Sequence, residues 1–379
     1  MYVELSEEHR MLRTASRDFA EKEIAPLVNE AEEKEQFPVQ LYSQLGKLGY
    51  LCASHPAQYG GAEMGMVGEC IVIEEISRVA VGIASALTSQ SGISTVPILE
   101  HGTEEQKQEY LVPAIKGVKI AAFGLTEPNA GSDAAAIETT ARRQGDSYIL
   151  NGTKLYITNG TICDFVLVAA STERSQGTRG ISAFIVEKGT PGFTAMKMHK
   201  FCMRSAETAE LVFEDCKVPV KNLIGEEGRG FSYVMECLDA GRISHSATSI
   251  GLAQAAYEAC LDYVQQREQF GQPIHRFQAT GFKVARMAME IEAARWLMYR
   301  AAWLYDEGNR RLKEASMAKL FASEVVQRVT SDAMQIHGAV AIMTESPIQR
   351  YFRDARRNTV TEGTSEIQQL VISRAIGLR

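Results

Sequence analysis

The 379-residue chain lacks the residue patterns that usually bind a metal ion. Its seven cysteines lie at least 14 residues apart, so no C-x-x-C pair is present, and its seven histidines form no H-E-x-x-H motif. An odd number of scattered cysteines also indicates reduced thiols, which favours a cytoplasmic protein. We therefore expect no metal site.

Long apolar runs and an excess of positive charge are missing as well. No stretch approaches the ~18 apolar residues that span a bilayer. The N-terminus MYVELSEEHR has neither the apolar core of a signal peptide nor an Arg-rich transit pattern. Forty Lys and Arg residues against 47 Asp and Glu residues leave a net charge of −7, which disfavours binding to nucleic acid or anionic lipid. The sequence predicts no nucleic-acid and no membrane partner.

The common nucleotide and hydrolase motifs are also absent. The segment GEEGRG at 225–230 is glycine-rich, but it lacks the G-x-G-x-x-G spacing and the β-α-β context of a Rossmann site. No P-loop and no G-x-S-x-G nucleophile motif occurs. A Rossmann dinucleotide site and a serine hydrolase are therefore disfavoured.

What the sequence contains is three blocks of different texture. Apolar residues recur at helical spacing from residue 4 to about 117, and short β-rich runs separated by Gly, Asn and Asp follow between about 120 and 224. Long helical segments then return at about 231–266, 276–307 and 311–337. Helices, then a β module, then helices are typical of an α+β fold rather than of alternating β-α units.

Two short segments of the β block predict turns or ligand loops. Asn151-Gly152 lies between two β-rich runs and predicts a hairpin. TEPNAGSD at 126–133 carries hydroxyl groups and a glycine, so its donors suit a flat heterocycle or a pyrophosphate. The same composition is more often that of a plain turn, and from these residues alone both interpretations stay open.

The chain resembles the acyl-CoA dehydrogenase family in six segments that keep the family's order and spacing over about 240 residues: TEPNAGSD, YITNG (156–160), REQFG (267–271), QIHG (335–338), RYFRDAR (350–356) and TEGTSEIQ (361–368). The resemblance implies an N-terminal helical domain (1–118), a middle β-barrel-like domain (119–226) and a C-terminal four-helix bundle (227–379). These agree with the three blocks. The resemblance also implies FAD as the cofactor.

Glu362 is the candidate catalytic base. Desaturation of an acyl thioester needs a group that removes the α-hydrogen while the β-hydrogen leaves as hydride to a flavin, and the resemblance matches Glu362 to the base that many relatives carry before Gly-Thr. Some relatives carry it instead on the first long bundle helix, where this chain has Gly241. We expect burial to raise the pKa of Glu362 more than a helix N-terminus lowers it. From the residues alone, Glu362 is more readily a helix-entry glutamate, because Ser365 and Gln368 fit an S-x-x-Q capping box.

The resemblance assigns further residues to FAD. Around the isoalloxazine and the pyrophosphate it places Phe123, Leu125, Thr126, Tyr156, Thr158, Gly131 and Ser132. At the ADP part it places Thr364 and four residues that relatives donate from a neighbouring subunit: Arg267, Phe270, Gln335 and Gly338. A dimer at least is implied, and a dimer of dimers is usual. Taken alone, Thr158 is more often an ordinary strand residue, and Thr364 could equally be a helix-entry residue.

Asp239, Arg242 and Gly363 are the candidate substrate-binding residues. The resemblance matches Asp239 and Arg242 to positions near the pantetheine and phosphate parts of CoA. Charges on a helix are as often solvated, but a net-negative protein needs a cation such as Arg242 to hold a polyanion. The small residues Gly241 and Thr361 suggest room for a branched or cyclic acyl group. The lack of Lys or Arg between residues 78 and 107 disfavours a dicarboxylic one.

The chain departs from the family's usual pattern at three positions. Ala339 and Ala341 stand where relatives commonly have glycine, and the added methyl groups would push the adenine end of FAD outward or shift the loop. Tyr156 stands where relatives often have Trp.

The favoured function is oxidation of a saturated acyl-CoA to the trans-2-enoyl-CoA, with electrons passed to an electron-transfer flavoprotein. The first alternative keeps the fold and changes the reaction to that of an acyl-CoA oxidase or a flavin monooxygenase. The second is a helical binding protein that has lost its flavin, which only Ala339 and Ala341 support.

Overall fold

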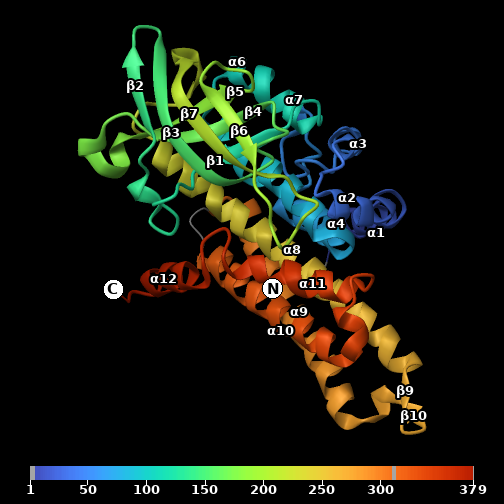
Figure 1. The fold of residues 1–379 in the computed structure, drawn as a ribbon. Coiled ribbons are helices and arrows are strands. Elements are labelled where there is room, and N and C mark those ends of the chain that lie inside the picture. Colours follow the sequence, from blue (N-terminus) through green and yellow to red (C-terminus); the bar gives the residue numbers. More distant parts are fainter. Residues whose placement is uncertain (1–4, 310–312, 379) are drawn as a thin grey trace.

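The computed structural model describes residues 5–309 and 313–378 of the chain, and it confirms the α+β class. Figure 1 shows a β-sheet domain at one end, a helical bundle at the other, and N-terminal helices at their junction. The predicted start of the third bundle helix at residue 311 lies outside the described residues. In the part of the chain that is described, no helix is long and apolar enough to cross a membrane.

The N-terminal third is helical, as its periodicity predicts. Its first helix begins after Ser6, whose side chain accepts a hydrogen bond from the backbone N–H of His9, and Glu7 and Glu8 occupy the first turn, where acids are favoured. The helical elements are α1 (Glu7–Phe19), η1 (Ala20–Ile24), η2 (Ala25–Leu27), α2 (Val28–Lys34), α3 (Gln40–Leu48), η3 (Ala57–Tyr59), α4 (Gly65–Thr88), η4 (Ser89–Ser94), α5 (Val96–His101), α6 (Glu104–Gln106), η5 (Lys107–Leu111) and α7 (Val112–Ile115).

The middle domain is one mixed sheet of eight strands in the order β6-β7-β3-β2-β4-β5-β8, with β1 paired to β4 in parallel. Its interior is a separate apolar cluster that includes Tyr148, Phe184 and Phe213. The strands are β1 (Ala121–Gly124), β2 (Thr140–Gln144), β3 (Ser147–Thr158), β4 (Phe165–Ser171), β5 (Ile181–Glu187), β6 (Phe193–Lys197), β7 (Thr208–Pro219) and β8 (Leu223–Ile224). Short 3-10 turns lie between them: η6 (Ala134–Ala136), η7 (Arg174–Gly180) and η8 (Val220–Asn222).

The hairpin predicted at Asn151-Gly152 is wrong. Both residues lie inside the continuous strand β3, at a register shift against β7 where Gly152 has φ +151°. The turn between β2 and β3 lies instead at Gly145 and Asp146. The pair therefore marks an irregularity within a long strand, one of the places where glycine is common in sheets.

The last third is built on three long helices, with two shorter ones packed beside them. α11 packs on α8 and α10, and α12 packs on α10 beneath the middle domain (Figure 1). The elements are α8 (Gly230–Gln266), β9 (Glu268–Gln269), β10 (Gln272–Pro273), η9 (Ile274–Arg276), α9 (Gln278–Asp306), α10 (Lys313–His337), η10 (Gly338–Ile342), α11 (Pro347–Ala355), η11 (Arg356–Thr359) and α12 (Ser365–Ala375).

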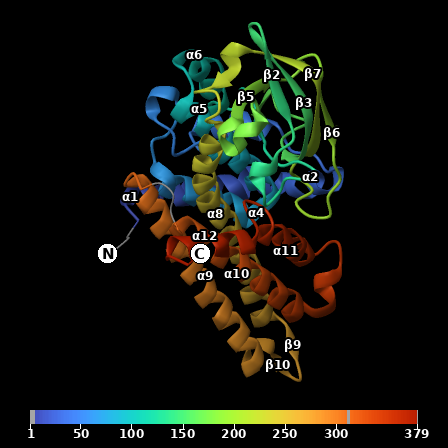
Figure 2. The same ribbon diagram turned by 90° about the vertical axis from the view of Figure 1, so that its left-hand side faces the viewer.

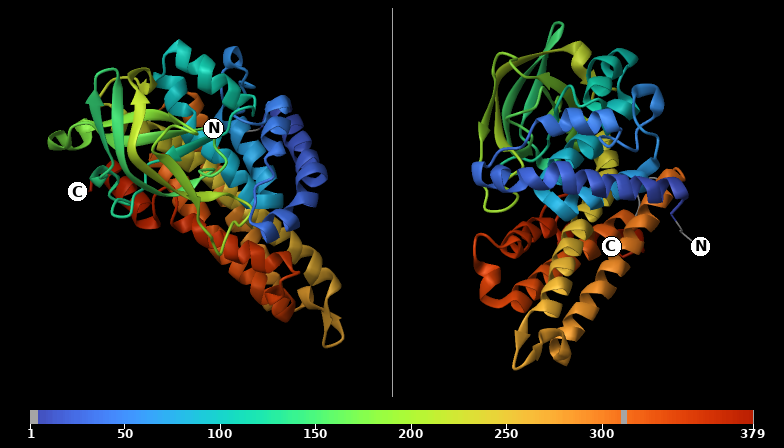
Figure 3. Two further views of the ribbon diagram at one scale, coloured as in Figure 1. Left: turned by 45° about the horizontal axis from the view of Figure 1, so that its top comes forward. Right: turned by 90° about the vertical axis from the view of Figure 1, so that its right-hand side faces the viewer.

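Helices α4 and α8 join the N-terminal domain to the bundle. Figure 2 shows them crossing between the sheet and the lower helices, and Figure 3 shows α1 lying across the same junction. The two helices approach closely at Gly251, where an added Cβ would lie 2.3 Å from the carbonyl oxygen of Glu74. Glycine at this position therefore lets two buried backbones touch.

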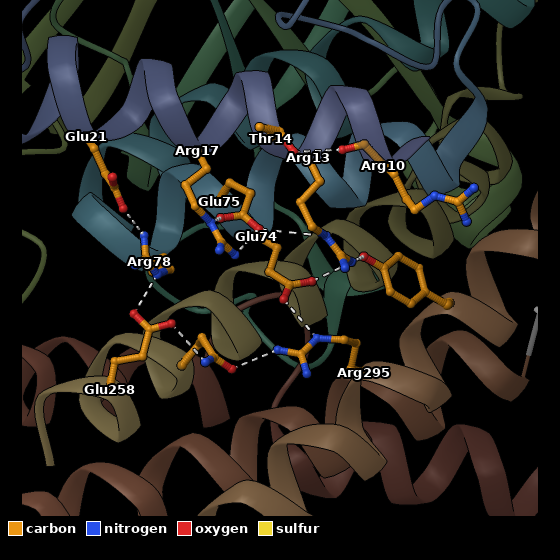
Figure 4. Close-up of polar contacts among 12 residues, drawn as sticks. Arg10, Arg13, Thr14, Arg17, Glu21, Glu74, Glu75, Arg78, Glu258 and Arg295 are labelled. Atoms are coloured by element: carbon orange, nitrogen blue, oxygen red, sulfur yellow. Dashed lines mark hydrogen bonds and ion pairs between the residues drawn. The ribbon is translucent and has the colours of Figure 1, made fainter. Parts of the chain in front are cut away.

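An ion-pair network reinforces the same junction (Figure 4). Arg17 on α1 donates two hydrogen bonds to Glu75 on α4, at 2.8 and 2.9 Å. Arg295 on α9 binds Glu74 at 2.9 Å, and Arg78 on α4 reaches Glu258 on α8 at 2.6 Å. The network surrounds a cavity of about 380 Å³, and it ties helices from both ends of the sequence together.

Candidate active site

Glu362 lies in a tight loop between η11 and α12, and its backbone is fixed from two sides. Its φ is +56°, an unusual value for a residue with a side chain. The side-chain amide of Gln368 donates to the carbonyl groups of Glu362 (2.8 Å) and Gly363 (3.0 Å), and Lys319 on α10 donates to the Gly363 carbonyl at 2.7 Å. Such strain, about 1–3 kcal/mol, persists where the surroundings impose it and is common at functional sites.

The capping box predicted for Ser365 and Gln368 is wrong. Thr364 is the N-cap of α12, and its hydroxyl accepts a hydrogen bond from the backbone N–H of Ile367. Gln368 is fully buried, and its side chain binds the loop at Glu362 and Gly363 instead of capping the helix. Glu362 therefore precedes the N-cap by two residues, and the helix-entry interpretation does not explain its position.

The Glu362 carboxyl points into the protein, toward α8. Its Oε2 is buried and has no hydrogen-bond partner within the described residues. A Cβ built on Gly241 would lie 2.9 Å from this oxygen and 2.9 Å from Cγ2 of Ile93 in η4. The two base positions suggested by the resemblance thus face the same small region. The suggestion that Gly241 and Thr361 leave room for a branched or cyclic acyl group stays a prediction.

Burial and nearby cations act on Glu362 in opposite directions. Burial raises its pKa, and the charges of Arg357, Arg242 and Lys319 partly lower it again. The net shift is upward, in the direction expected from the sequence. A desolvated carboxylate with an unsatisfied oxygen is suited to accept a proton.

Asp239 and Arg242 are not solvated charges on a helix surface. They form an ion pair at 2.7 Å on α8, with 8% and 11% of their side chains exposed. The Nε of Arg242 is buried and has no hydrogen-bond partner in the described part of the chain. Because the charge of Arg242 also acts on Glu362, the pair lies at the edge of the same site as Gly363.

The candidate isoalloxazine residues come together in the middle domain. Phe123 lies in β1, and Leu125 and Thr126 directly follow that strand. The backbone N–H of Leu155 donates to the Thr126 carbonyl at 2.8 Å. This contact holds the loop against β3, which carries Tyr156 and Thr158. Gly131 and Ser132 continue the loop and are exposed, with open space around Gly131.

A buried ion pair holds this loop in shape. The Nζ of Lys154 lies 2.6 Å from Oε1 of Glu127 and also donates to the Leu125 carbonyl at 3.1 Å, and both side chains are almost fully buried. Glu127 in turn accepts hydrogen bonds from the backbone N–H groups of Glu138 and Thr139. The TEPNAGSD segment is therefore a rigid, specifically held loop rather than a plain turn.

These residues fit a flat aromatic ligand such as the flavin of FAD. The ring of Tyr156 is 63% exposed although its backbone is held at φ +62°. The side chains of Thr126 and Thr158 are half-buried, and neither hydroxyl has a hydrogen-bond partner among the described residues. An exposed ring beside two available hydroxyl groups suits stacking and hydrogen bonding to a heterocycle.

Four predicted FAD residues lie elsewhere, at the far end of the bundle. Arg267 and Phe270 flank β9, Gln335 lies in the last turn of α10, and Gly338 follows that helix as the first residue of η10. Figure 1 shows this end pointing away from the sheet domain. Within one chain these four residues do not join the other candidates, and the ring of Phe270 is 93% exposed.

The two alanines that replace family glycines differ in environment. Ala341 is fully buried in the apolar core of the bundle, whereas Ala339 is exposed in η10. The methyl group of Ala341 therefore packs inward. Of the two, only Ala339 stands where a methyl group would meet a ligand at the surface.

Sequence reasoning missed the groups that fix and tune Glu362. Lys319 and Arg357 supply positive charge, and Gln368 holds the loop. One sequence signal could have indicated that Lys319 is buried: it lies among alanines at helical spacing, and Ala315, Ala318 and Ala322 are buried in the structure. A lysine at a core position is rare and marks a partner or a function.

In the described ranges, no group of three or more His, Cys, Asp or Glu side chains is arranged to hold a metal ion.

Comparison with known proteins places these features in context. Residues 6–118, 122–216 and 228–377 match the family descriptions "Acyl-CoA dehydrogenase" N-terminal, middle and C-terminal domain. The chain is 43% identical to a short-chain specific acyl-CoA dehydrogenase of Clostridium acetobutylicum, over 99% of this chain and all of that protein.

Two solved structures have the same fold over the whole chain. Butyryl-CoA dehydrogenase from Megasphaera elsdenii is 41% identical with a TM-score of 0.96, covering 99% of this chain and 100% of that chain. A chain in a study of the electron transferring flavoprotein of Acidaminococcus fermentans is 44% identical with a TM-score of 0.97, covering 100% of both.

Proposed function

This chain belongs to the acyl-CoA dehydrogenase family and is an oxidoreductase, and on that premise we propose that it oxidises a short saturated acyl-CoA to the trans-2-enoyl-CoA with Glu362 as the base. The observation that carries the proposal is the buried, unpartnered Oε2 of Glu362 beside Gly241. The short acyl chain is inferred from relatives described as short-chain specific and as butyryl-CoA dehydrogenase.

The chain's own residues perform the binding and proton-transfer parts of this reaction. Glu362 removes the α-proton of the thioester, and its burial makes the carboxylate a stronger base. Bound FAD would supply the acceptor for the β-hydrogen, which leaves the substrate as hydride. Phe123, Leu125, Tyr156 and the hydroxyl groups of Thr126 and Thr158 would hold its ring, and Gly131 and Ser132 its pyrophosphate.

The remaining candidates are assigned to the ends of the two ligands. Arg242, oriented by Asp239, would supply positive charge to CoA, and Gly363 would contact the thioester beside the base. Thr364, the N-cap of α12, would contact the ADP part of FAD. We assign these roles on the family positions and on their grouping around Glu362.

We propose an electron-transfer flavoprotein as the electron acceptor. One of the similar structures comes from a study of such a flavoprotein, and the similar proteins named above include two dehydrogenases. These relatives favour the dehydrogenase over the oxidase or monooxygenase. The cytoplasmic location remains a prediction.

We also propose that the chain works as a homo-oligomer, a dimer at least and a dimer of dimers by family resemblance. Arg267, Phe270, Gln335 and Gly338 lie too far down the bundle to meet the flavin residues of their own chain (Figure 1). A second copy could bring them there, and the exposed ring of Phe270 would then be covered.

The exposed face of α9 suits such pairing. Phe282, Met289 and Trp296 are 64%, 64% and 49% exposed and lie seven residues apart, so they form one apolar stripe along the helix. If two copies of α9 cross antiparallel at Met289, residues equally far before and after it meet. Phe282 then faces Trp296, and Arg286 faces Glu292, which also pairs with Arg295 of its own chain at 2.8 Å. The face is therefore complementary to itself.

The test of the proposed reaction is anaerobic mixing of the FAD-loaded protein with butyryl-CoA. We expect the flavin colour to bleach in the wild-type protein. In the Glu362→Gln variant, which keeps shape and volume, we expect flavin to remain bound and bleaching to be lost. Normal bleaching in this variant would remove Glu362 from the role of base, and no bleaching of the wild type by any acyl-CoA would reject the reaction.

A further inference from the structure

Lys319 is a buried cation that the proposed reaction does not use. It lies on α10 and is fully buried, and its only hydrogen bond in the described part of the chain is the one to the carbonyl of Gly363. That carbonyl also accepts a hydrogen bond from Gln368 at 3.0 Å. An apolar residue at position 319 would thus leave no unsatisfied carbonyl and would avoid the cost of burying an ammonium group.

Each element packed around Lys319 presents charged or titratable groups. The loop and α12 present Glu362 and Glu366, η11 presents Arg357, and α8 presents Arg242. His245 on α8 is also near, but burial and the charges of Arg357 and Lys319 hold its pKa well below the usual value, so it is neutral. Lys319 therefore sits among two carboxylates and two guanidinium groups.

Three cations act on the Glu362 carboxyl, and Lys319 is the one whose side chain also donates a hydrogen bond to the loop that carries Glu362, although the charges of Arg357 and Arg242 act more strongly. Arg242 is shared with Asp239 through an ion pair at 2.7 Å, and Arg357, whose strongest attractive neighbour is also Glu362, acts on Cys202 and Asp354 as well. For Lys319 the strongest attractive neighbour is Glu362, with Glu366 a weaker and exposed one. Burial lowers the pKa of Lys319 to about 8, so the group is charged at and below neutral pH.

We propose that Lys319 is a positioning residue for the base: its ammonium group holds the carbonyl that follows Glu362, and its charge favours the ionised form of the Glu362 carboxyl. The inference rests on the proposed role of Glu362. It assigns two effects to one side chain, a fixed loop and a more readily ionised base. The second effect is one that a purely structural lysine would not have.

The test compares three substitutions at position 319 by the pH at which flavin reduction is half-maximal on the acid side. Lys319→Met and Lys319→Gln remove the charge, so we expect this pH to rise by about one unit, the low end of what a nearby opposite charge does. Below the midpoint the variants would then react about tenfold more slowly than the wild type at the same pH. Lys319→Arg keeps the charge and should stay close to the wild-type midpoint.

Lys200→Met is the matched control. Lys200 is partly buried, with a pKa lowered to about 8, and it also donates to a backbone carbonyl, that of Ala206 at 2.8 Å. Its charge is not among those that act on Glu362. We expect this variant to lose thermal stability but to keep the wild-type midpoint.

An infrared titration without substrate separates this inference from the proposed reaction. The protonated-carboxyl band that disappears in Glu362→Gln reports the ionisation of Glu362 directly, and we expect it to persist to higher pH in the Met and Gln variants. If wild-type protein fails to oxidise any acyl-CoA, this titration still decides the role of Lys319. Unchanged midpoints in both charge-removing variants would overturn the inference, and so would an equal shift in Lys319→Arg. If Lys319→Met does not fold, the Gln and Arg pair gives the same decision.

Discussion

At the scale of single residues, Glu362 combines three features that lower the stability of the folded protein. The backbone is left-handed, the carboxyl is desolvated, and Oε2 has no partner within the described residues. Each is unfavourable for folding, and together they leave a carboxylate that gains by accepting a proton.

This environment predicts the pH dependence of the reaction. The base must be ionised to act, and burial raises its pKa above that of an ordinary glutamate. The rate of flavin reduction at low acyl-CoA concentration, which reports the free protein, should therefore rise with pH through a midpoint above the usual glutamate range. A midpoint at or below that range would contradict the burial of the carboxyl.

The sequence identified Glu362 only through family resemblance. Taken alone, TEGTSEIQ fits a capping box, because Ser365 and Gln368 have the required spacing. What decides against the box is the contact of Gln368 with two backbone carbonyls held in a left-handed turn. The spacing of residues along TEGTSEIQ does not reveal this contact, because it depends on the three-dimensional path of the loop. Lys319 was missed because a lysine in a helical pattern is normally exposed.

At the scale of elements, the helical blocks were predicted well and one strand feature was not. Helical periodicity is local, so the blocks of α1 to α7 and of α8 to α10 follow from spacing and from Gly and Pro stops. The Asn151-Gly152 pair has the composition of a tight turn. Its place in β3 is set by pairing with β7, which lies more than 50 residues later in the sequence.

The close contact of α4 and α8 gives a prediction at this scale. Gly251→Ala would place a Cβ 2.3 Å from the Glu74 carbonyl oxygen and 2.6 Å from Cβ of Ser77, so the two helices must separate. We expect a loss of about 3 kcal/mol or more, seen as a lower apparent melting temperature.

Gly281→Ala provides the control. Gly281 lies in α9, and its added Cβ would meet only the His275 carbonyl oxygen at 3.4 Å. Because alanine favours a helix over glycine by up to about 1 kcal/mol, this variant should melt at or slightly above the wild-type temperature. Equal melting of both variants would show that the α4–α8 contact adapts freely.

At the scale of the whole molecule, the residues assigned to FAD are split between the sheet domain and the far end of the bundle (Figure 1). Under this assignment, one chain presents two separate groups of candidate FAD residues. The α+β class and the order of the three blocks were predictable from texture. Texture did not predict the separation of the two groups, because it depends on the length and direction of α8, α9 and α10; only the family resemblance implied it, by placing four of the residues on a neighbouring subunit.

Met289→Glu tests the proposed pairing of α9. Where two copies cross at Met289, the substitution would bring two like charges together and remove the central apolar contact, so we expect smaller particles by light scattering and weaker FAD retention. Met11→Glu alters an equally exposed methionine on α1, 66% exposed against 64%, and should leave the assembly intact. If Met289→Glu keeps the wild-type mass, the α9 face is not the contact.

The left-handed backbone at Glu362 has a wider consequence. A glycine at position 362 would adopt that conformation without strain, and it would remove the buried oxygen that has no hydrogen-bond partner among the described residues. The thermal stability of the fold and the proposed proton abstraction therefore favour different residues at this position. A relative that lost the reaction by replacing this glutamate with glycine would gain stability from the same substitution. Loss of activity at this site therefore does not imply loss of the fold.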